Sequence, residues 1–376
     1  MQYFIFLILL SLSLFAHSTL DLSSEQKEGI NYGVYSDIKY RDKDLYPRGI
    51  EGSLGYENHG TTKKAQFNHL GLYLFGDYEK NFIYGVEFNK HIDAEDSFDS
   101  YLEKAYVGYK THHNNTLKLG RDYNNISFVN NKPYGYGFAD MPLAIDSFLD
   151  GTYLGDGIFL EYANTDNMKS YLDVTQDKYN KNNRSTLKLE YNLKDTQLIA
   201  YLQYRKTAQL RFDYSATTHT HSHGNQNGCT NLSSLNERCF ERDNKLLGLG
   251  FNHKIGVFDL QGEYLYLDSK GDVYNNQYKV ENHNKINTLY LQGLTNYQKI
   301  LLGYRSEWFM FDNHYNGGGA TEITAPLVSQ NANKIQNLQT LMLGYKFNKN
   351  NKTSIELKQS QDDWAFGLNY NLFFGN

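Results

Sequence analysis

The sequence predicts an all-β chain that closes into a transmembrane antiparallel β-barrel of 16 or 18 strands. Apolar and polar residues alternate along most of the chain, and the alternating segments are separated by connections that are short and long in turn. Tyr (33) and Phe (22) are abundant, while Pro (4) is scarce. Aromatic side chains suit a pleated surface and proline cannot donate to a β-ladder, so this composition also favours strands.

Residues 1–18 are expected to be a secretory signal peptide. Tyr3 to Phe15 is almost unbroken in apolar residues, and Ala16 and Ser18 offer small residues at a cleavage point. Positive charge before the apolar stretch comes from the amino terminus alone, so a short N-terminal anchor is the alternative. Residues 19–29 would form a short segment before a single barrel over 30–376.

Alternation with a period of two places successive side chains on opposite faces of a strand. In residues 196–205, Leu198 and Leu202 alternate with Tyr201 and Gln203. The segments are close to the roughly 9–11 residues that a tilted strand needs to cross a bilayer. About seventeen are found, and single-chain bacterial barrels have even strand numbers, so 16 or 18 are expected. The segments lie at 30–40, 50–57, 66–78, 82–89, 101–110, 116–121, 157–163, 169–175, 185–193, 196–205, 245–254, 257–266, 286–294, 298–308, 338–347, 353–359 and 364–374.

The lengths of the connections indicate a membrane barrel rather than a soluble sandwich. Outer-membrane barrels have short turns at one end and long loops at the other, whereas a sandwich has no reason to alternate in this way. We therefore expect 206–244 to be a long extracellular loop. The short connections fall at 194–195, 255–256, 295–297 and 348–351, and the long polar ones at 206–244, 268–284 and 309–335.

The apolar face of each segment is expected to meet lipid, and the polar face to line a water-filled interior. Unpaired charges are costly in a dry core, but a barrel of 16–18 strands is wide enough to hydrate them. The alternative is a soluble protein whose charges face bulk water. The predicted pore-lining residues are Lys104, Lys118, Glu161, Lys188, Glu190, Arg205, Glu263, Arg305 and Glu307.

Two stretches resemble bacterial porins. Glu103–Tyr109 (EKAYVGY) and Leu117–Arg121 (LKLGR) are similar to the strand pair that precedes the third loop in that family. Met141–Gly151 (MPLAIDSFLDG) resembles the segment that follows it in OprD-like and epsilonproteobacterial major porins. The resemblance implies that 122–152 folds inward and narrows a passive outer-membrane channel for small hydrophilic solutes and ions. It leaves a homotrimer or a monomer open.

The charge of this predicted constriction loop suggests an ion preference. Residues 122–152 contain four Asp and one Lys, a net charge of −3 (4 minus 1). Carboxylates at a narrow point attract cations and repel anions, so we expect a mild cation preference. Alternatively, these Asp residues cap turns. The candidate constriction residues are Arg121, Asp140, Asp146 and Asp150.

The 206–244 loop holds two further candidates. His219, His221 and His223 alternate on what would be an extended segment and could bind Zn, Ni or Cu. Cys229 and Cys239 are expected to form a disulfide, because exported proteins meet an oxidising compartment. The loop could therefore serve an adhesin or a metal-collecting protein. Otherwise it is a polar surface loop.

No enzyme motif stands out. G-x-S-x-G, H-E-x-x-H and P-loop sequences are absent, so we expect neither catalysis nor a cofactor. The net charge of −5 does not suggest nucleic-acid binding. The expected partners are outer-membrane lipid, the transported solutes and the outer-membrane assembly machinery. Assembly usually reads a terminal aromatic residue, whereas Phe374 is followed here by Gly375 and Asn376.

Overall fold

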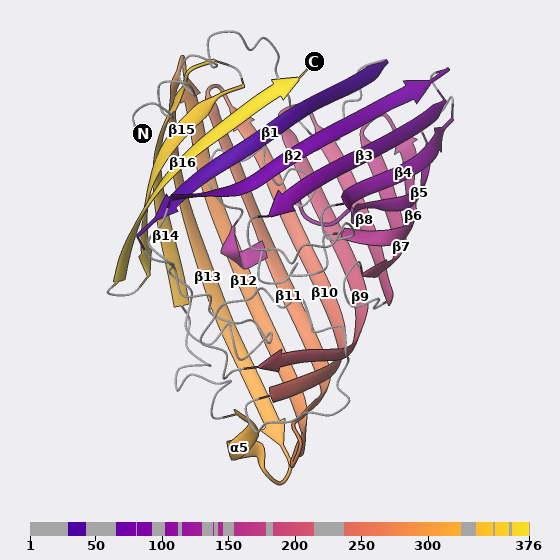
Figure 1. The fold of residues 1–376 in the computed structure, drawn as a ribbon, viewed down its shortest axis with the longest axis vertical. Coiled ribbons are helices and arrows are strands. Elements are labelled where there is room, and N and C mark those ends of the chain that lie inside the picture. Colours follow the sequence, from indigo (N-terminus) through magenta and orange to yellow (C-terminus); the bar gives the residue numbers. More distant parts are fainter. Residues whose placement is uncertain are drawn as a thin grey trace.

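The described residues form one closed antiparallel β-barrel of sixteen strands (Figure 1). The computed structural model describes residues 29–42, 65–79, 81–91, 102–111, 115–129, 138, 142–145, 154–177, 183–213, 237–324, 336–348, 350–360 and 363–375. The first strand, β1 (Ile30–Arg41), closes the barrel by pairing with the last, β16 (Asp363–Gly375). The predicted fold class is confirmed, with the smaller of the two strand numbers.

Every strand coincides with one of the predicted alternating segments. The additional predicted segment, 50–57, lies outside the described residues. The other strands are β2 (Ala65–Tyr78), β3 (Phe82–His91), β4 (Leu102–Lys110), β5 (Thr116–Tyr123), β6 (Leu154–Thr165), β7 (Met168–Asp177), β8 (Asn183–Leu193), β9 (Thr196–Asp213), β10 (Glu237–Ile255), β11 (Phe258–Tyr274), β12 (Lys279–Tyr297), β13 (Ile300–Asn316), β14 (Gln336–Lys346) and β15 (Lys352–Ser360).

The short turns gather at one end of the barrel. Lys194-Asp195 joins β8 to β9 and Gly256-Val257 joins β10 to β11, as the sequence predicts. Gly256 has a φ of 58°, a left-handed conformation that glycine adopts without steric cost. Because all strands are antiparallel, β1 begins and β16 ends at this same end.

All three predicted long connections are wrong in extent. Strands β9 to β13 have 17–19 residues each, and they reach beyond the others in Figure 1. Most of 268–284 is paired strand, with a turn at 275–278. Likewise, 309–335 begins as strand up to Asn316, and both ends of 206–244 belong to β9 and β10.

The side chains explain why the sequence pattern missed these strand ends. We call the parts of β9 to β13 that continue past the predicted segments the strand extension. At its beginning, the outer face of β10 to β13 carries four charged residues side by side: Lys245, Asp268, Lys285 and Asp312. Charges replace the apolar residues there, so the hydrophobic alternation disappears although the backbone pairing continues. Ion pairs such as Lys279–Asp272, at 2.8 Å, connect neighbouring strands instead.

A short helix, α5 (Ala320–Thr324), lies at the tip of the long strands (Figure 1). Its Ile323 packs in a small apolar cluster with Phe240, Val273 and Val280. The buried Arg238 of β10 donates hydrogen bonds to the backbone carbonyls of Glu322 and Ile323, at 3.1 and 3.0 Å. The chain after β13 is thereby attached to the strand extension.

The predicted assignment of strand faces is confirmed for the outer surface. Large apolar side chains such as Val107 (64% exposed) and Leu202 (54%) project outward from strands around the barrel. Their immediate chain neighbours point inward, as the period of two requires. Within the described ranges, none of the helices has the length and apolar character needed to cross a membrane.

The inner face differs from the prediction, because part of it is apolar. Ile199, Leu265, Ile286, Phe309 and Phe311 point inward from β9 to β13 and belong to one buried cluster. The prediction that the inner face is polar and meets water is therefore wrong for this half of the barrel. The apolar inner surface is covered by chain from the connection between β5 and β6.

Candidate functional site

The connection between β5 and β6 enters the barrel. We call its described residues 124–129, 138 and 142–145 the inward segment. Ile126, Val129 and Ile145 are fully buried and join the apolar cluster on the inner faces of β9 to β13. These residues therefore pack against the inner wall, while a constriction formed by 122–152 stays a prediction. The apolar patch on the wall is the surface against which they pack.

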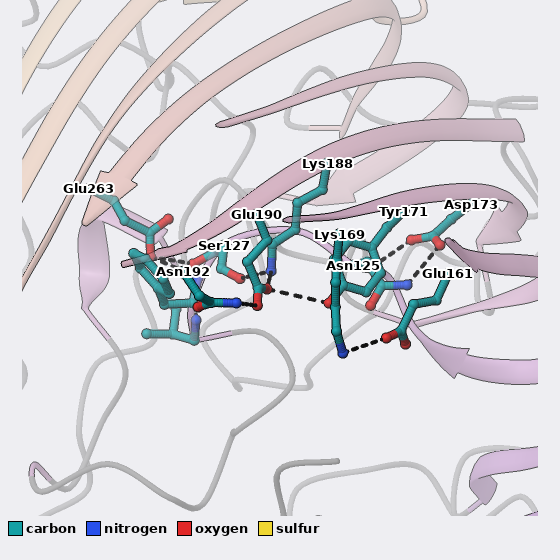
Figure 2. Close-up of polar contacts among 12 residues, drawn as sticks. Asn125, Ser127, Glu161, Lys169, Tyr171, Asp173, Lys188, Glu190, Asn192 and Glu263 are labelled. Carbon is teal, nitrogen blue, oxygen red and sulfur yellow. Dashed lines mark hydrogen bonds and ion pairs between the residues drawn. The ribbon is translucent and has the colours of Figure 1, made fainter. Parts of the chain in front are cut away.

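Buried carboxylates of the wall anchor this segment at separate points. Asp173 of β7 accepts hydrogen bonds from the backbone N–H and side-chain amide of Asn125, at 2.5 and 2.9 Å (Figure 2). Glu307 of β13 accepts one from the backbone N–H of Ala144, at 2.8 Å. These contacts hold the two arms of the segment, 124–129 and 142–145, against the wall.

Glu263 of β11 is the central anchor. Its carboxylate accepts hydrogen bonds from the Ser127 hydroxyl at 2.7 Å and the Phe128 backbone N–H at 3.0 Å. Two wall hydroxyls donate to it as well, Tyr290 at 2.7 Å and Tyr201 at 3.0 Å. Glu263 is 1% exposed.

Glycines of the wall make room for two aromatic side chains of the segment. A Cβ placed on Gly250 of β10 would lie 2.9 Å from the Phe128 ring, and one on Gly303 of β13 would lie 2.9 Å from the Phe138 ring. Both distances are shorter than ordinary carbon contacts. The guanidinium of Arg305 lies over the Phe138 ring, 4.6 Å from its centroid.

The wall on the other side, from β3 to β7, presents ion pairs that keep contact with solvent. Lys118 pairs with Asp122 at 2.8 Å. Lys169 pairs with Glu161 at 2.7 Å (Figure 2). The side chains of Lys118, Lys169 and Glu161 are 29%, 41% and 28% exposed. In both pairs the lysine is more exposed than its partner. These groups can meet a solute in water.

A third ion pair of a lysine on this wall is held by aromatic rings. Lys104 lies 3.0 Å from Glu87, and its ammonium sits 5.1 and 4.7 Å from the ring centroids of Phe75 and Tyr123. Cation–π contacts of this kind restrict where a flexible lysine can point. The inner charges of this wall therefore have defined positions.

The predicted pore-lining residues all occupy inward positions of their strands, but burial divides them. Lys188, Glu263, Arg305 and Glu307 are buried, and each contacts the inward segment: Lys188, for instance, donates to the carbonyl of Ser127 at 3.3 Å. They do not border an open path. The residues that keep some exposure, and for which pore lining stays a prediction, are Lys104, Lys118, Glu161, Glu190 and Arg205.

Arg121 does not fit the constriction role. It follows Leu117 and Leu119 in the alternation of β5, and these leucines are exposed on the outer face. Its guanidinium binds both carboxylate oxygens of Asp156, at 2.6 and 2.9 Å, and Asp156 shares the outer face with Ile158 on β6. The prediction placed Arg121 at the constriction although its alternation with Leu117 and Leu119 already indicates the outer face.

Several candidates lie outside the described residues: Asp140, Asp146, Asp150, the three histidines and Cys229. The constriction charges, the metal site and the disulfide therefore stay predictions. Cys239 is described and fully buried on β10. In the part of the chain that is described, no group of three or more His, Cys, Asp or Glu side chains is suited to a metal ion.

Sequence reasoning missed the features that position the inward segment. Gly250 and Gly303 were not selected as site residues, and neither were Phe128 and Phe138. One signal was present: Gly248 and Gly250 alternate on the inward face of β10, which leaves that wall without side chains. Nothing in the sequence says which aromatic residue fills such a space.

No family model and no curated protein matches the sequence. Solved structures do resemble the barrel. OmpT of Vibrio cholerae, an outer membrane protein, in its trimer form, has a TM-score of 0.58 at 11% identity over 93% of this chain and 100% of that one. The outer membrane channel DcaP of Acinetobacter baumannii gives 0.56 at 13%, covering 93% and 99%. Salmonella typhi OmpF in complex with daunomycin gives 0.56 at 9%, covering 92% and 97%. At such identities the likeness establishes the fold: the chain has the sixteen-stranded barrel architecture of outer-membrane proteins.

Proposed function

We propose that this protein is an outer-membrane porin, a passive diffusion channel for small hydrophilic solutes and ions. The observation that carries the proposal is the contrast between the two faces of the barrel. The outer face is a belt of exposed apolar side chains, while inward charges such as Lys118 and Glu161 remain partly hydrated. Lipid outside and water inside is the environment that suits both faces.

The arrangement of the interior also suggests where solutes pass. The inner faces of β9 to β13 are covered by the inward segment, so the aqueous path would run beside β3 to β7. Lys118–Asp122 and Lys169–Glu161 border this side. The path would be narrower than the barrel and off its axis, which favours small solutes.

Liposome swelling tests the channel directly. Liposomes that contain the purified protein are expected to swell in isotonic solutions of small sugars, at rates that fall steeply with solute size. Protein-free liposomes and liposomes with heat-unfolded protein serve as controls. Swelling rates no higher than those of the controls, with folded protein present in the membrane, would contradict the proposal.

We further propose a mild preference for cations, which rests on the acidic composition of 122–152. Replacing Asp140, Asp146 and Asp150 together by Asn is expected to shift the reversal potential in a KCl gradient toward zero or toward anion selectivity, because the carboxylates that attract cations are removed. Asp195→Asn, in the exposed turn between β8 and β9, is the matched control. An unchanged reversal potential in the triple variant would reject the role of these residues.

The oligomeric state is part of the same proposal. One of the similar structures is a trimer form, and we propose a homotrimer for this protein on that basis. The outer membrane is the proposed location, since the apolar belt requires lipid.

A further inference from the structure

We propose that Glu263 is a positioning residue whose carboxyl group holds the inward segment against the wall by accepting four hydrogen bonds. This inference rests on the proposed function, because the consequence of the arrangement is the width of the solute path. Its structural part can be measured independently of transport.

Four donors converge on the carboxyl group of Glu263. One oxygen accepts from the Ser127 hydroxyl, the Phe128 N–H and the Tyr290 hydroxyl, and the other accepts from the Tyr201 hydroxyl. An ionised carboxylate accepts at about four positions and donates at none. A neutral acid or an amide has fewer acceptor positions and adds a donor, so at least one of the three hydroxyls would have to reverse its hydrogen bond, whereas the Phe128 N–H can only donate.

These four donors come from both the wall and the inward segment. Tyr201 and Tyr290 belong to β9 and β12 of the wall, while Ser127 and Phe128 belong to the inward segment. The carboxylate therefore connects three elements of the wall to the segment. Because Glu263 is almost fully excluded from solvent, water cannot replace a lost partner, and an unmatched buried donor is costly.

The backbone of Ser127 is held in an uncommon conformation. Its φ of 61° lies in the left-handed region, which residues other than glycine seldom adopt. Such a conformation persists when the surroundings over-determine it. Here the Ser127 hydroxyl is bound by Glu263, its carbonyl accepts from the Lys188 ammonium at 3.3 Å, and its hydroxyl also accepts from the Val129 N–H at 3.1 Å (Figure 2).

The close packing around the anchor supports the same role. Gly250 pairs with Glu263 across β10 and β11, and the Phe128 ring lies over that glycine. The bond from the Phe128 N–H thus holds the ring at the point where the wall leaves space for it. Loss of the bond would free the ring and the turn at 127–129 together.

The test compares Glu263→Gln with Glu87→Gln. Glu87 is equally buried and inward-facing, but its partners are Tyr35 and Lys104 of the wall. Hydrogen exchange in detergent micelles is expected to speed up at Phe128 and Val129 in Glu263→Gln by about fivefold, because an amide oxygen accepts a weaker hydrogen bond than a carboxylate does. Exchange there should be unchanged in Glu87→Gln, and strand amides should stay protected in both.

Two further variants keep the test decisive if Glu263→Gln does not fold. Ser127→Ala removes one donor of the segment and should speed up exchange at Phe128, whereas Tyr290→Phe removes a donor of the wall and should affect it less. Equal exchange at Phe128 in wild type, Glu263→Gln and Ser127→Ala would overturn the inference.

Transport gives the second measurement. In planar bilayers, Glu263→Gln is expected to show frequent closures where the wild type holds a steady current, because the freed segment enters the path. Steady current in Glu263→Gln would contradict the positioning role. Absence of current in wild type would count against the proposed function instead, while the exchange result would still decide the role of Glu263.

Discussion

Replacing Leu202 by arginine is expected to destabilise the folded barrel by about 2–4 kcal/mol, the cost measured for a basic side chain in the middle of the lipid-facing surface of a membrane barrel. Leu202 is more than half exposed, and its neighbours on the adjacent strands are the exposed Leu187 and Leu247. An arginine there finds neither water nor a carboxylate among these neighbours. Urea titration of the protein folded in phospholipid vesicles measures the free energy of unfolding.

The matched control lies on the same strand. Gln197→Arg places the same charge on the inward face of β9, between Asn192 and Asn252 of the neighbouring strands. Its effect should be much smaller, because these surroundings are polar. If both variants lost the same stability, the assignment of the outer face to lipid would have to be abandoned.

The second large effect is expected for Gly250→Val. A Cβ at this position would lie 2.7 Å from Cγ of Glu263, 2.9 Å from the Phe128 ring and 3.0 Å from Ile199. Overfilling of this kind costs about 1–3 kcal/mol, and the neighbour that can move is the segment rather than the paired strands. We therefore expect lower stability and slower liposome swelling, as Phe128 leaves the wall for the solute path.

Gly293→Val is the control for backbone effects. Gly293 lies on β12, where an added Cβ would meet Leu260 alone within 4 Å, at 3.3 Å. Valine is as good a strand former there as at position 250. Similar swelling rates for the two variants would show that the segment does not depend on the space above Gly250.

The fold was largely predictable because one physical rule acts on every strand. Each lipid-facing position must be apolar, so residues such as Leu198 and Leu202 reveal their strand without any tertiary information. The rule fails where the strands leave the apolar belt. At Lys245, Asp268 and Lys285 the pairing of the strands continues, but no hydrophobic period remains to indicate it.

The interior was harder to predict because it obeys two rules at once. Inward positions that meet water are charged, such as Lys118 and Glu161, whereas those that meet the inward segment are apolar, such as Leu265 and Phe309. A sequence shows the alternation but not which partner covers a given wall. The sequence therefore predicted that Glu263 and Glu307 line the pore, whereas in the structure both bind the inward segment.

The central claim is that a hydrated path crosses the barrel beside the inward segment. Single-channel recording in planar bilayers tests it most directly. Protein refolded into detergent and added to one chamber is expected to produce uniform, stepwise and persistent increases in current in KCl. Stable insertion of folded protein without any step in current would mean that the interior is closed, and the proposal of a diffusion channel would be wrong.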